Sequence, residues 1–230
     1  NFVDRRVPFF EDYVVQYTDL PFLVALEQGP DGTVVPGKFL TAAELGRSEA
    51  KAADAAFKTV LLDRDAGTPV VPNGSVGFRY NDEDAGKWNL DLQGVVPALS
   101  ITDASSWGGE TSRVELPAFT DPTGVGSVMH RGVPVTTVAG KTGTTVFDLM
   151  LAQYGVARPG LVPGELPGEW ATGYDDAQTP YTPAWQQEIT NVSPEAVIRT
   201  AREFAANAEK SHGRSMIILG AGICQWYHGD

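Results

Sequence analysis

The chain has 230 residues and carries 29 acidic against 17 basic side chains, a formal net charge of −12 at pH 7. A surface of this sign repels phosphate backbones, so the composition argues against nucleic-acid binding. The hydrophobic content of 42% and the charged content of 20% are those of a globular protein. The single cysteine, Cys224, excludes an internal disulfide and any cysteine-based metal site within this segment. No stretch approaches the roughly 20 apolar residues of a membrane span.

Residues 1–26 predict a short helix followed by an extended apolar segment. Phe and Tyr side chains and a valine recur at helical spacing between residues 9 and 17. Pro21 separates this helix from the apolar residues 22–26, because proline disfavours helix in the residue before it.

The long middle stretch, residues 27–145, predicts a β-rich and irregular structure. Glycine and proline are frequent here, which favours loops over long helices. An Ala-rich segment, 45–58, predicts an exposed helix. The other expected elements are turns at 30–33 and 72–75 and strands at 76–80 and 133–138. Such a stretch is typical of an insertion into a larger enzyme rather than of a self-sufficient domain.

Regular helices return from residue 146. Residues 146–155 predict a helix that stops at Gly155. Thr182 and Ser193 are each followed by proline, the pattern of an N-cap and a first helical residue, so each begins a helix. The second of these helices should end at His212-Gly213. Its apolar stripe consists of Val197, Ile198, Ala201, Phe204, Ala205 and Ala208.

The next segment predicts the beginning of a cofactor-binding unit. Residues 216–219, Met-Ile-Ile-Leu, are typical of a strand buried on both faces of a parallel sheet. The turn Gly220-Ala221-Gly222 follows at once and would bring backbone N–H groups close to a ligand. Helix, buried strand and glycine turn form the pattern of a doubly wound α/β layer. A crossover helix and a neighbouring strand should come next, yet the sequence ends at Asp230, so we expect a piece of a longer polypeptide.

The ligand expected at this turn is a nucleotide or another phosphate-bearing cofactor. Gln225, Trp226 and His228 follow at the same sheet edge, where Gln and His can hydrogen-bond a heterocycle and Trp can stack. Helix packing alone is the alternative explanation of the two glycines, because the third glycine of the dinucleotide fingerprint is absent.

Other candidate motifs are better explained by structure. Residues 140–142, Gly-Lys-Thr, resemble the end of a phosphate-binding loop, but Val135 stands where that motif needs glycine, so a polar hairpin is expected. Asp175 and Asp176 are interpreted as a solvated face, since paired catalytic carboxylates need convergent positions. No Ser/His/Asp or Cys/His arrangement is visible. The sequence therefore assigns no catalytic and no metal-ligating residue.

Three motifs of the C-terminal region are similar to one enzyme family. They are Thr-Pro-x-Trp…Glu-Ile-Thr-x-Val-Ser at 182–193, Ala-Arg-Glu-Phe-Ala at 201–205 and the strand ending in Gly-x-Gly at 217–222. With them, the chain resembles the alpha subunit of respiratory, membrane-bound nitrate reductases, which are molybdopterin oxidoreductases of the dimethyl-sulfoxide-reductase type. Other segments, 7–21, 71–79, 86–90 and 212–218, resemble the nitrate reductase branch specifically.

The resemblance implies an internal piece of a multidomain molybdopterin oxidoreductase with an α/β fold. In it, residues 1–26 end a preceding α/β domain, 27–145 form a β-rich irregular insertion, and 146–230 begin a doubly wound α/β domain that binds the molybdopterin dinucleotide. The implied reaction reduces nitrate to nitrite at molybdenum held by two molybdopterin guanine dinucleotides, with electrons from quinol through iron–sulfur clusters. The ligands of the molybdenum and of the [4Fe-4S] cluster would lie outside this segment.

The same resemblance implies partners and a location. The partners are an iron–sulfur electron-transfer beta subunit and a membrane-anchoring, quinol-oxidising gamma subunit, which would hold the protein on the cytoplasmic face of the cell membrane. The cofactor-binding candidates are Gly220, Ala221, Gly222, Gln225, Trp226 and His228. The alternatives are another molybdopterin oxidoreductase, such as a formate dehydrogenase or other oxyanion reductase, and a non-catalytic acidic interaction module.

Overall fold

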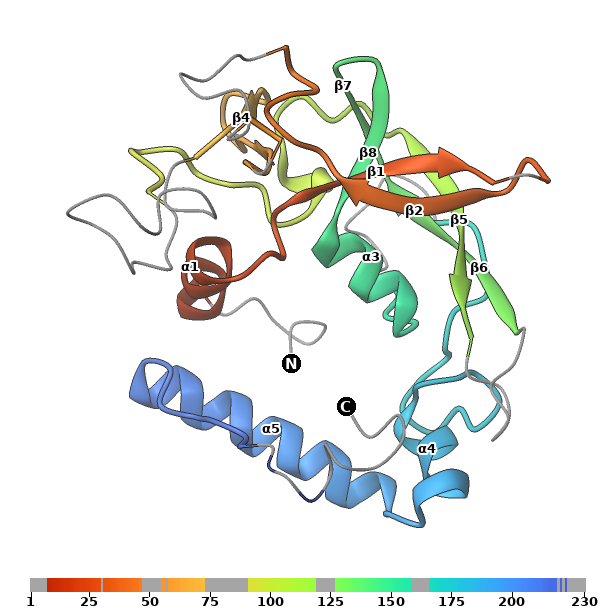
Figure 1. The fold of residues 1–230 in the computed structure, drawn as a ribbon. Coiled ribbons are helices and arrows are strands. Elements are labelled where there is room, and N and C mark those ends of the chain that lie inside the picture. Colours follow the sequence, from red (N-terminus) through yellow and green to blue (C-terminus); the bar gives the residue numbers. More distant parts are fainter. Residues whose placement is uncertain are drawn as a thin grey trace.

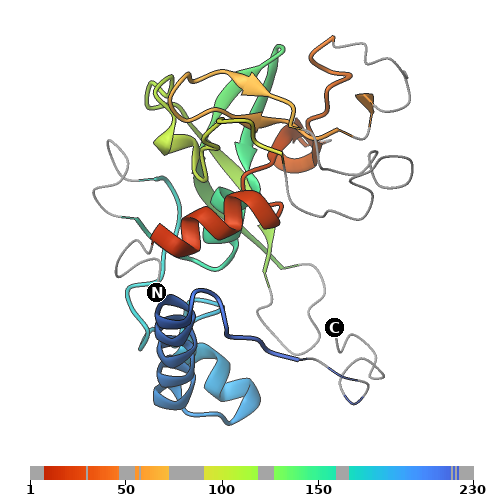
Figure 2. The ribbon, with the colours of Figure 1, turned by 90° about the vertical axis from the view of Figure 1, so that its left-hand side faces the viewer.

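The computed structural model describes residues 8–29, 31–46, 55–56, 58–72, 91–118, 127–158 and 166–218, together with Gly220 and Gly222. These residues form a β-rich body that carries helices α1 and α3, and a pair of helices, α4 and α5 (Figure 1). The view turned by 90° also places the helical pair to one side of the body (Figure 2).

The main sheet of the body has four antiparallel strands in the order β2-β1-β8-β7. The central strands are β1 (Leu23–Gln28) and β8 (Lys141–Thr145), and the outer ones are β2 (Val34–Phe39) and β7 (Thr136–Val138). The turn between β1 and β2 contains Gly32 with φ +84°, which confirms the turn predicted at 30–33 for its described residues. The sheet thus pairs the start of the chain with residues more than a hundred positions later.

The Gly-Lys-Thr segment at 140–142 belongs to the hairpin between β7 and β8, as the sequence predicts. Ala139 and Gly140 both have positive φ, +50° and +78°, as a two-residue turn of type I′ requires. Lys141 pairs with Val138 in the hairpin register and makes an ion pair with Glu44. The hairpin interpretation is confirmed.

A second antiparallel hairpin is formed by β5 (Thr111–Pro117) and β6 (Val128–Pro134). The strand predicted at 133–138 is divided between β6 and β7, and the break follows from Pro134, which has no N–H to offer a ladder. Two short strands, β3 (Leu61–Leu62) and β4 (Pro69–Val70), form a further small sheet. A 3₁₀ turn, η1 (Ile101–Asp103), lies beside the main core.

Helices α1 (Pro8–Tyr17) and α3 (Val146–Gln153) form where the sequence predicts them. The Thr145 hydroxyl caps α3 by accepting from the Asp148 N–H at 3.0 Å. Gly155, with φ +70°, follows the end of α3 and confirms the predicted stop. One buried cluster joins the two helices and consists of Val14, Leu99, Phe147 and Leu151.

The helical pair consists of α4 (Pro183–Thr190) and α5 (Pro194–Ser211). Both predicted caps are confirmed, because the Thr182 and Ser193 hydroxyls accept from the backbone N–H three residues later at 3.1 and 3.3 Å. α5 ends at His212, whose φ of +53° is left-handed. No residue of α4 or α5 is buried, so the apolar stripe of α5 covers no core among the described residues.

The buried strand predicted at residues 216–219 is not formed. Met216, Ile217 and Ile218 are 77%, 70% and 79% exposed and belong to no strand, and Leu219 lies outside the described residues. A parallel strand needs neighbours to pair with, and all the strand pairs among the described residues are antiparallel. The expectation is therefore wrong for this structure, which is a mixed α/β piece with small antiparallel sheets.

Two predicted elements in the middle of the chain fall mainly on residues that the structure does not describe. The strand expected at 76–80 lies wholly outside them. Of the helix expected at 45–58, residues 45 and 46 lie in turns and most of the remainder is outside the described ranges. In the helices that are described, no segment is long and apolar enough to cross a membrane.

Candidate functional site

Two of the six predicted cofactor-binding residues, Gly220 and Gly222, are described. Both are exposed, and a Cβ added at either would meet no atom within 4 Å. Neither has a φ in the left-handed region. Packing within the described chain therefore does not explain glycine at these positions. The other four candidates, Ala221, Gln225, Trp226 and His228, lie outside the described residues.

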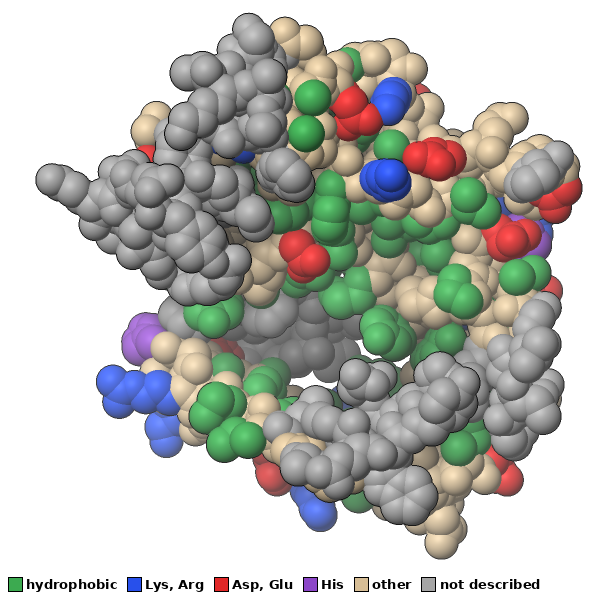
Figure 3. All heavy atoms as spheres, in the orientation of Figure 1, with side chains coloured by type: hydrophobic (Ala, Val, Ile, Leu, Met, Phe, Trp, Pro, Cys, Tyr) green, Lys and Arg blue, Asp and Glu red, His purple; other side chains and the backbone are tan. Residues whose placement is uncertain are grey.

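The glycine turn follows α5, and large apolar side chains are exposed around the helical pair. Figure 3 shows hydrophobic side chains exposed along the helical pair and on the side of the body that faces it, with a hollow between the two. The large exposed apolar side chains of the helical region are Tyr174, Ile189, Val192 and Phe204. Exposed apolar area of this kind marks a surface that is suited to burial against another segment or partner.

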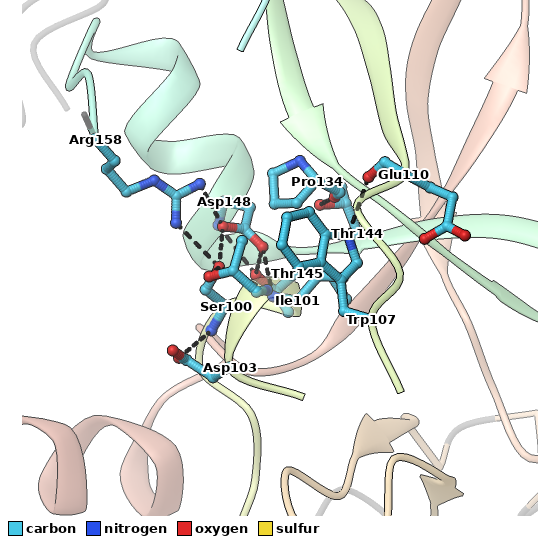
Figure 4. A network of polar contacts seen from close by, with 11 residues as sticks. Ser100, Ile101, Asp103, Trp107, Glu110, Pro134, Thr144, Thr145, Asp148 and Arg158 are labelled. Atoms are coloured by element: carbon cyan, nitrogen blue, oxygen red, sulfur yellow. Dashed lines mark hydrogen bonds and ion pairs between the residues drawn. The ribbon is translucent and has the colours of Figure 1, made fainter. Parts of the chain in front are cut away.

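A buried polar network, which the sequence analysis missed, lies at the first turn of α3 (Figure 4). Asp148 Oδ1 accepts from the Ser100 hydroxyl at 2.7 Å and forms an ion pair with Arg158 Nη2 at 2.8 Å. Asp148 Oδ2 accepts from the Ile101 N–H and the Thr145 hydroxyl, both at 2.9 Å. Four donors from three parts of the chain thus surround one carboxylate.

Burial raises the pKa of Asp148, and the Arg158 charge and the hydrogen bonds act against that rise. Because protein donors occupy both carboxylate oxygens, the group is built to join segments rather than to accept a substrate proton. Ser100 also caps η1 reciprocally with Asp103, whose Oδ2 accepts from the Ser100 N–H at 3.2 Å. The signal in the sequence was the repeated spacing Ser-x-x-Asp at 100–103 and Thr-x-x-Asp at 145–148.

Arg131 is a second buried charge and is 2% exposed. Its guanidinium donates to the carbonyl oxygens of Ala152 and Gln153 at 2.6 and 3.1 Å, and its Nε donates to the Glu169 carbonyl at 2.8 Å. It also lies 5.6 Å from the ring of Trp170. Positive charge at the C-terminal end of α3 is favoured by the helix dipole. Arg131 therefore fastens residues 169–170 to α3.

Asp176 organises the loop before α4, whereas the sequence analysis assigned it to a solvated face. The carboxylate accepts from the N–H groups of Thr172, Gln178 and Thr179 at 3.1, 2.9 and 3.1 Å, and from the Thr179 hydroxyl at 2.7 Å. These hydrogen bonds hold the pKa of Asp176 far below its usual range. Asp176 is half-buried, and its carboxylate is engaged in the structure of the loop.

Among the described residues, no group of three or more His, Cys, Asp and Glu side chains could hold a metal ion. His130 faces Glu115 across the β5–β6 hairpin with Nε2 3.3 Å from the carboxylate oxygen. A single such pair is a surface contact between strands and not a ligand set.

Comparison with known proteins gives matches along the whole chain. It is 53% identical over 231 residues to the nitrate reductase alpha subunit of Mycobacterium tuberculosis, and 40% identical over 244 residues to the respiratory nitrate reductase 1 alpha chain of Escherichia coli. It is 37% identical over 239 residues to the nitrate reductase alpha chain of Bacillus subtilis. These alignments include 99–100% of this chain but only 18–19% of each relative. No protein-family model matches the chain.

The alignments relate the chain to subunits of oxidoreductases, as a segment that spans about a fifth of its relatives' length. More specifically, the chain is homologous from end to end to an internal segment of the nitrate reductase alpha subunit. The resemblance seen in the sequence is thereby confirmed.

Proposed function

We propose that this chain serves as part of the catalytic subunit of a molybdenum-dependent respiratory nitrate reductase, which reduces nitrate to nitrite. The observation that carries the proposal is the 53% identity to a nitrate reductase alpha subunit over the whole chain. Nitrate reductase alpha chains from three further organisms or isoforms support nitrate over formate as the substrate.

The cofactor proposed for the turn at 220–222 is a molybdopterin guanine dinucleotide. The described residues fit such a group, because the backbone at Gly220 and Gly222 is exposed and free of neighbouring atoms where a Cβ would stand. Backbone N–H groups would bind phosphate oxygens there, and Gln225, Trp226 and His228 would hydrogen-bond or stack on the heterocycle. When bound, the molybdenum cofactor supplies oxygen-atom transfer, and the chain's residues bind and orient it.

A [4Fe-4S] cluster does not fit this chain. Its ligands are normally several cysteines, and Cys224 is the single one in the sequence. We therefore propose that the cluster and the molybdenum are held by other parts of the subunit, and no step of the reaction is assigned to a side chain of this segment.

The proposed fold of the cofactor region is a doubly wound α/β domain that begins at residue 146. Two observations support it. The apolar stripe of α5 is unburied, and the three apolar residues Met216, Ile217 and Ile218 are at least 70% exposed. The relatives are about five times longer than this chain, so the remainder of such a subunit has ample length to supply neighbouring strands. In this arrangement residues 1–26 close a preceding domain and 27–145 form an insertion.

The proposed partners follow from the respiratory relatives. An iron–sulfur beta subunit would deliver electrons, and a membrane-anchoring gamma subunit would oxidise quinol. The protein would then lie at the cytoplasmic face of the membrane through these partners.

The test is to produce the complete gene product that contains this chain in a molybdenum-replete anaerobic host. We expect the purified protein to contain molybdopterin guanine dinucleotide and to reduce nitrate with a viologen dye as electron donor. Gly220→Val should lower the cofactor content, because a branched side chain would fill the space open to the phosphate. Ala206→Val, which adds the same branched side chain bulk at an exposed position on α5 and away from the turn, is the control. A wild-type protein without molybdopterin would refute the proposal.

A further inference from the structure

Tyr181 links the helical pair to the β-rich body. Its ring lies between two others, 5.6 Å from Tyr154 at the end of α3 and 5.4 Å from Trp185 in α4. The Gln153 side-chain amide donates to the Tyr181 hydroxyl at 3.1 Å and to the Pro117 carbonyl at 2.8 Å. The Tyr181 hydroxyl also donates to the Pro117 carbonyl at 3.5 Å, so this one side chain contacts α3, α4 and the end of β5.

The backbone of Tyr181 is in an unfavourable conformation. Its φ of +74° is left-handed, a region that large side chains avoid because Cβ approaches the following carbonyl. Such a conformation persists when the surrounding contacts hold it in place. The two ring contacts and the hydrogen bonds of the hydroxyl with Gln153 and Pro117 are contacts that can do so here.

Other described contacts join α4 and α5 to each other and to the loop before α4. α4 packs against α5, and the Gln186 side chain donates to the Val192 carbonyl between them at 2.8 Å. The Ala184 N–H donates to the Tyr174 carbonyl at 3.1 Å, and the Arg202 guanidinium lies 5.9 Å from the ring of Tyr174. Figures 1 and 2 both show the pair beside the body and not within it.

We propose that Tyr181 is a positioning residue, whose ring locks the α4–α5 pair against the β-rich body and so fixes where the glycine turn after α5 lies. The locking follows from the contacts of the ring. Its consequence for a cofactor rests on the proposed function, because it requires that the turn at 220–222 contact the molybdopterin dinucleotide.

The test of locking is hydrogen–deuterium exchange, read by mass spectrometry, on the complete gene product. Tyr181→Ala removes both ring contacts, and we expect exchange in α4 and α5 to rise about tenfold while β1 and β8 stay as in the wild type. Tyr17→Ala is the control, because Tyr17 likewise packs on an aromatic ring, Tyr13 at 5.0 Å, but lies on α1. It should leave α4 and α5 unchanged.

Two further variants separate the ring from the backbone strain. Tyr181→Gly relaxes the left-handed φ and still removes the ring, so exchange in α4 and α5 should rise as in Tyr181→Ala. A slower exchange than in the wild type would mean that strain dominates and would overturn the proposal. Tyr181→Phe keeps the ring and loses the hydroxyl's hydrogen bonds with Gln153 and Pro117, so it should raise exchange about threefold. This variant decides the matter if Tyr181→Ala does not accumulate.

The consequence for the cofactor is measured separately, as molybdopterin per polypeptide. Tyr181→Ala should retain at most about a tenth of the wild-type content, and Tyr181→Phe should retain most of it. Loosened helices with full cofactor content would overturn the positioning role. A uniform rise of exchange through β1 and β8, or no rise in α4 and α5, would overturn the locking. If the wild type contains no molybdopterin, the proposed function fails while the exchange experiment still tests the lock.

Discussion

Arg158 and Asp148 form an ion pair that is almost completely withdrawn from water. Arg158 Nη2 lies 2.8 Å from Asp148 Oδ1, and the two side chains are 5% and 0% exposed. The pair is extended by the Ser100 hydroxyl, which contacts both side chains at 2.7 and 3.0 Å. The Asp148 carboxylate joins residues that are far apart in the sequence. The stability of the β-rich body should therefore depend on the side chains that bind this carboxylate.

Replacing Arg158 with methionine should destabilise the protein strongly. The change leaves the buried Asp148 carboxylate without its counter-charge, a loss typically of about 3–5 kcal/mol in the free energy of unfolding. Urea unfolding at neutral pH measures it. The double variant Arg158→Met with Asp148→Asn is the control and should recover part of the loss, because no unpaired charge remains buried. Equal stability of the single variant and the wild type would contradict the structural role.

The loss of unfolding free energy caused by Arg158→Met should depend on pH. Burial raises the pKa of Asp148 above its usual value, and removal of Arg158 takes away an opposing effect, so the pKa should rise further in the variant. A carboxyl group whose pKa is raised by folding favours the folded state at low pH and loses that contribution as the pH rises through the folded pKa. The difference in unfolding free energy between wild type and variant should therefore grow from pH 4 to pH 8. A constant difference would show that Asp148 does not titrate in this range.

The contribution of Asp176 to stability should depend on pH in the opposite direction to that of Asp148. Its hydrogen bonds from Thr179, Thr172 and Gln178 lower the pKa on folding, so the contribution of Asp176 is present above its unfolded pKa and is lost as the pH falls through the lower, folded value. Measured relative to the intrinsic rate, which itself slows in acid, amide exchange at Thr172, Gln178 and Thr179 should accelerate as the pH falls in the wild type. In Asp176→Asn it should be faster already at pH 7 and less dependent on acid. Asp175→Asn, which removes the neighbouring charge, should behave as the wild type.

Substitution by alanine should lower the stability of the protein at one glycine and leave it almost unchanged at another. A Cβ at Gly132 would lie 2.4 Å from Pro167 Cδ and 2.8 Å from its backbone N, so Gly132→Ala should cost about 1–3 kcal/mol in the free energy of unfolding. At Gly220 the same Cβ meets nothing within 4 Å, and Gly220→Ala should leave the stability within about 0.5 kcal/mol of the wild type. Thermal unfolding of both variants checks this contrast. A comparable loss at Gly220 would mean that the turn packs against the chain itself.

Local signals in the sequence predicted local structure well. The caps at Thr182 and Ser193, the stop at Gly155 and the hairpin at 140–142 all depend on neighbouring residues, and all are confirmed. The polar network around Asp148 depends on partners 47 and 48 residues away, and the sequence pattern indicates only the two caps within it. The prediction of a strand at 216–219 was wrong for a related reason. A buried parallel strand forms only with neighbouring strands, and the described residues do not supply them.

The apolar stripe of α5 predicts a contrast between two phenylalanines. Phe147 is 1% exposed in the cluster that joins α1 and α3, so Phe147→Ala should cost about 3–5 kcal/mol in the free energy of unfolding. Phe204 is 39% exposed on α5, and Phe204→Ala should cost at most about 0.5 kcal/mol when the chain is produced alone. In the complete gene product, the proposed α/β domain would bury Phe204 against neighbouring elements. There the same substitution should cost about 2 kcal/mol or more, measured by urea unfolding of that domain. A negligible cost in both forms would show that α5 remains exposed and would contradict the doubly wound arrangement.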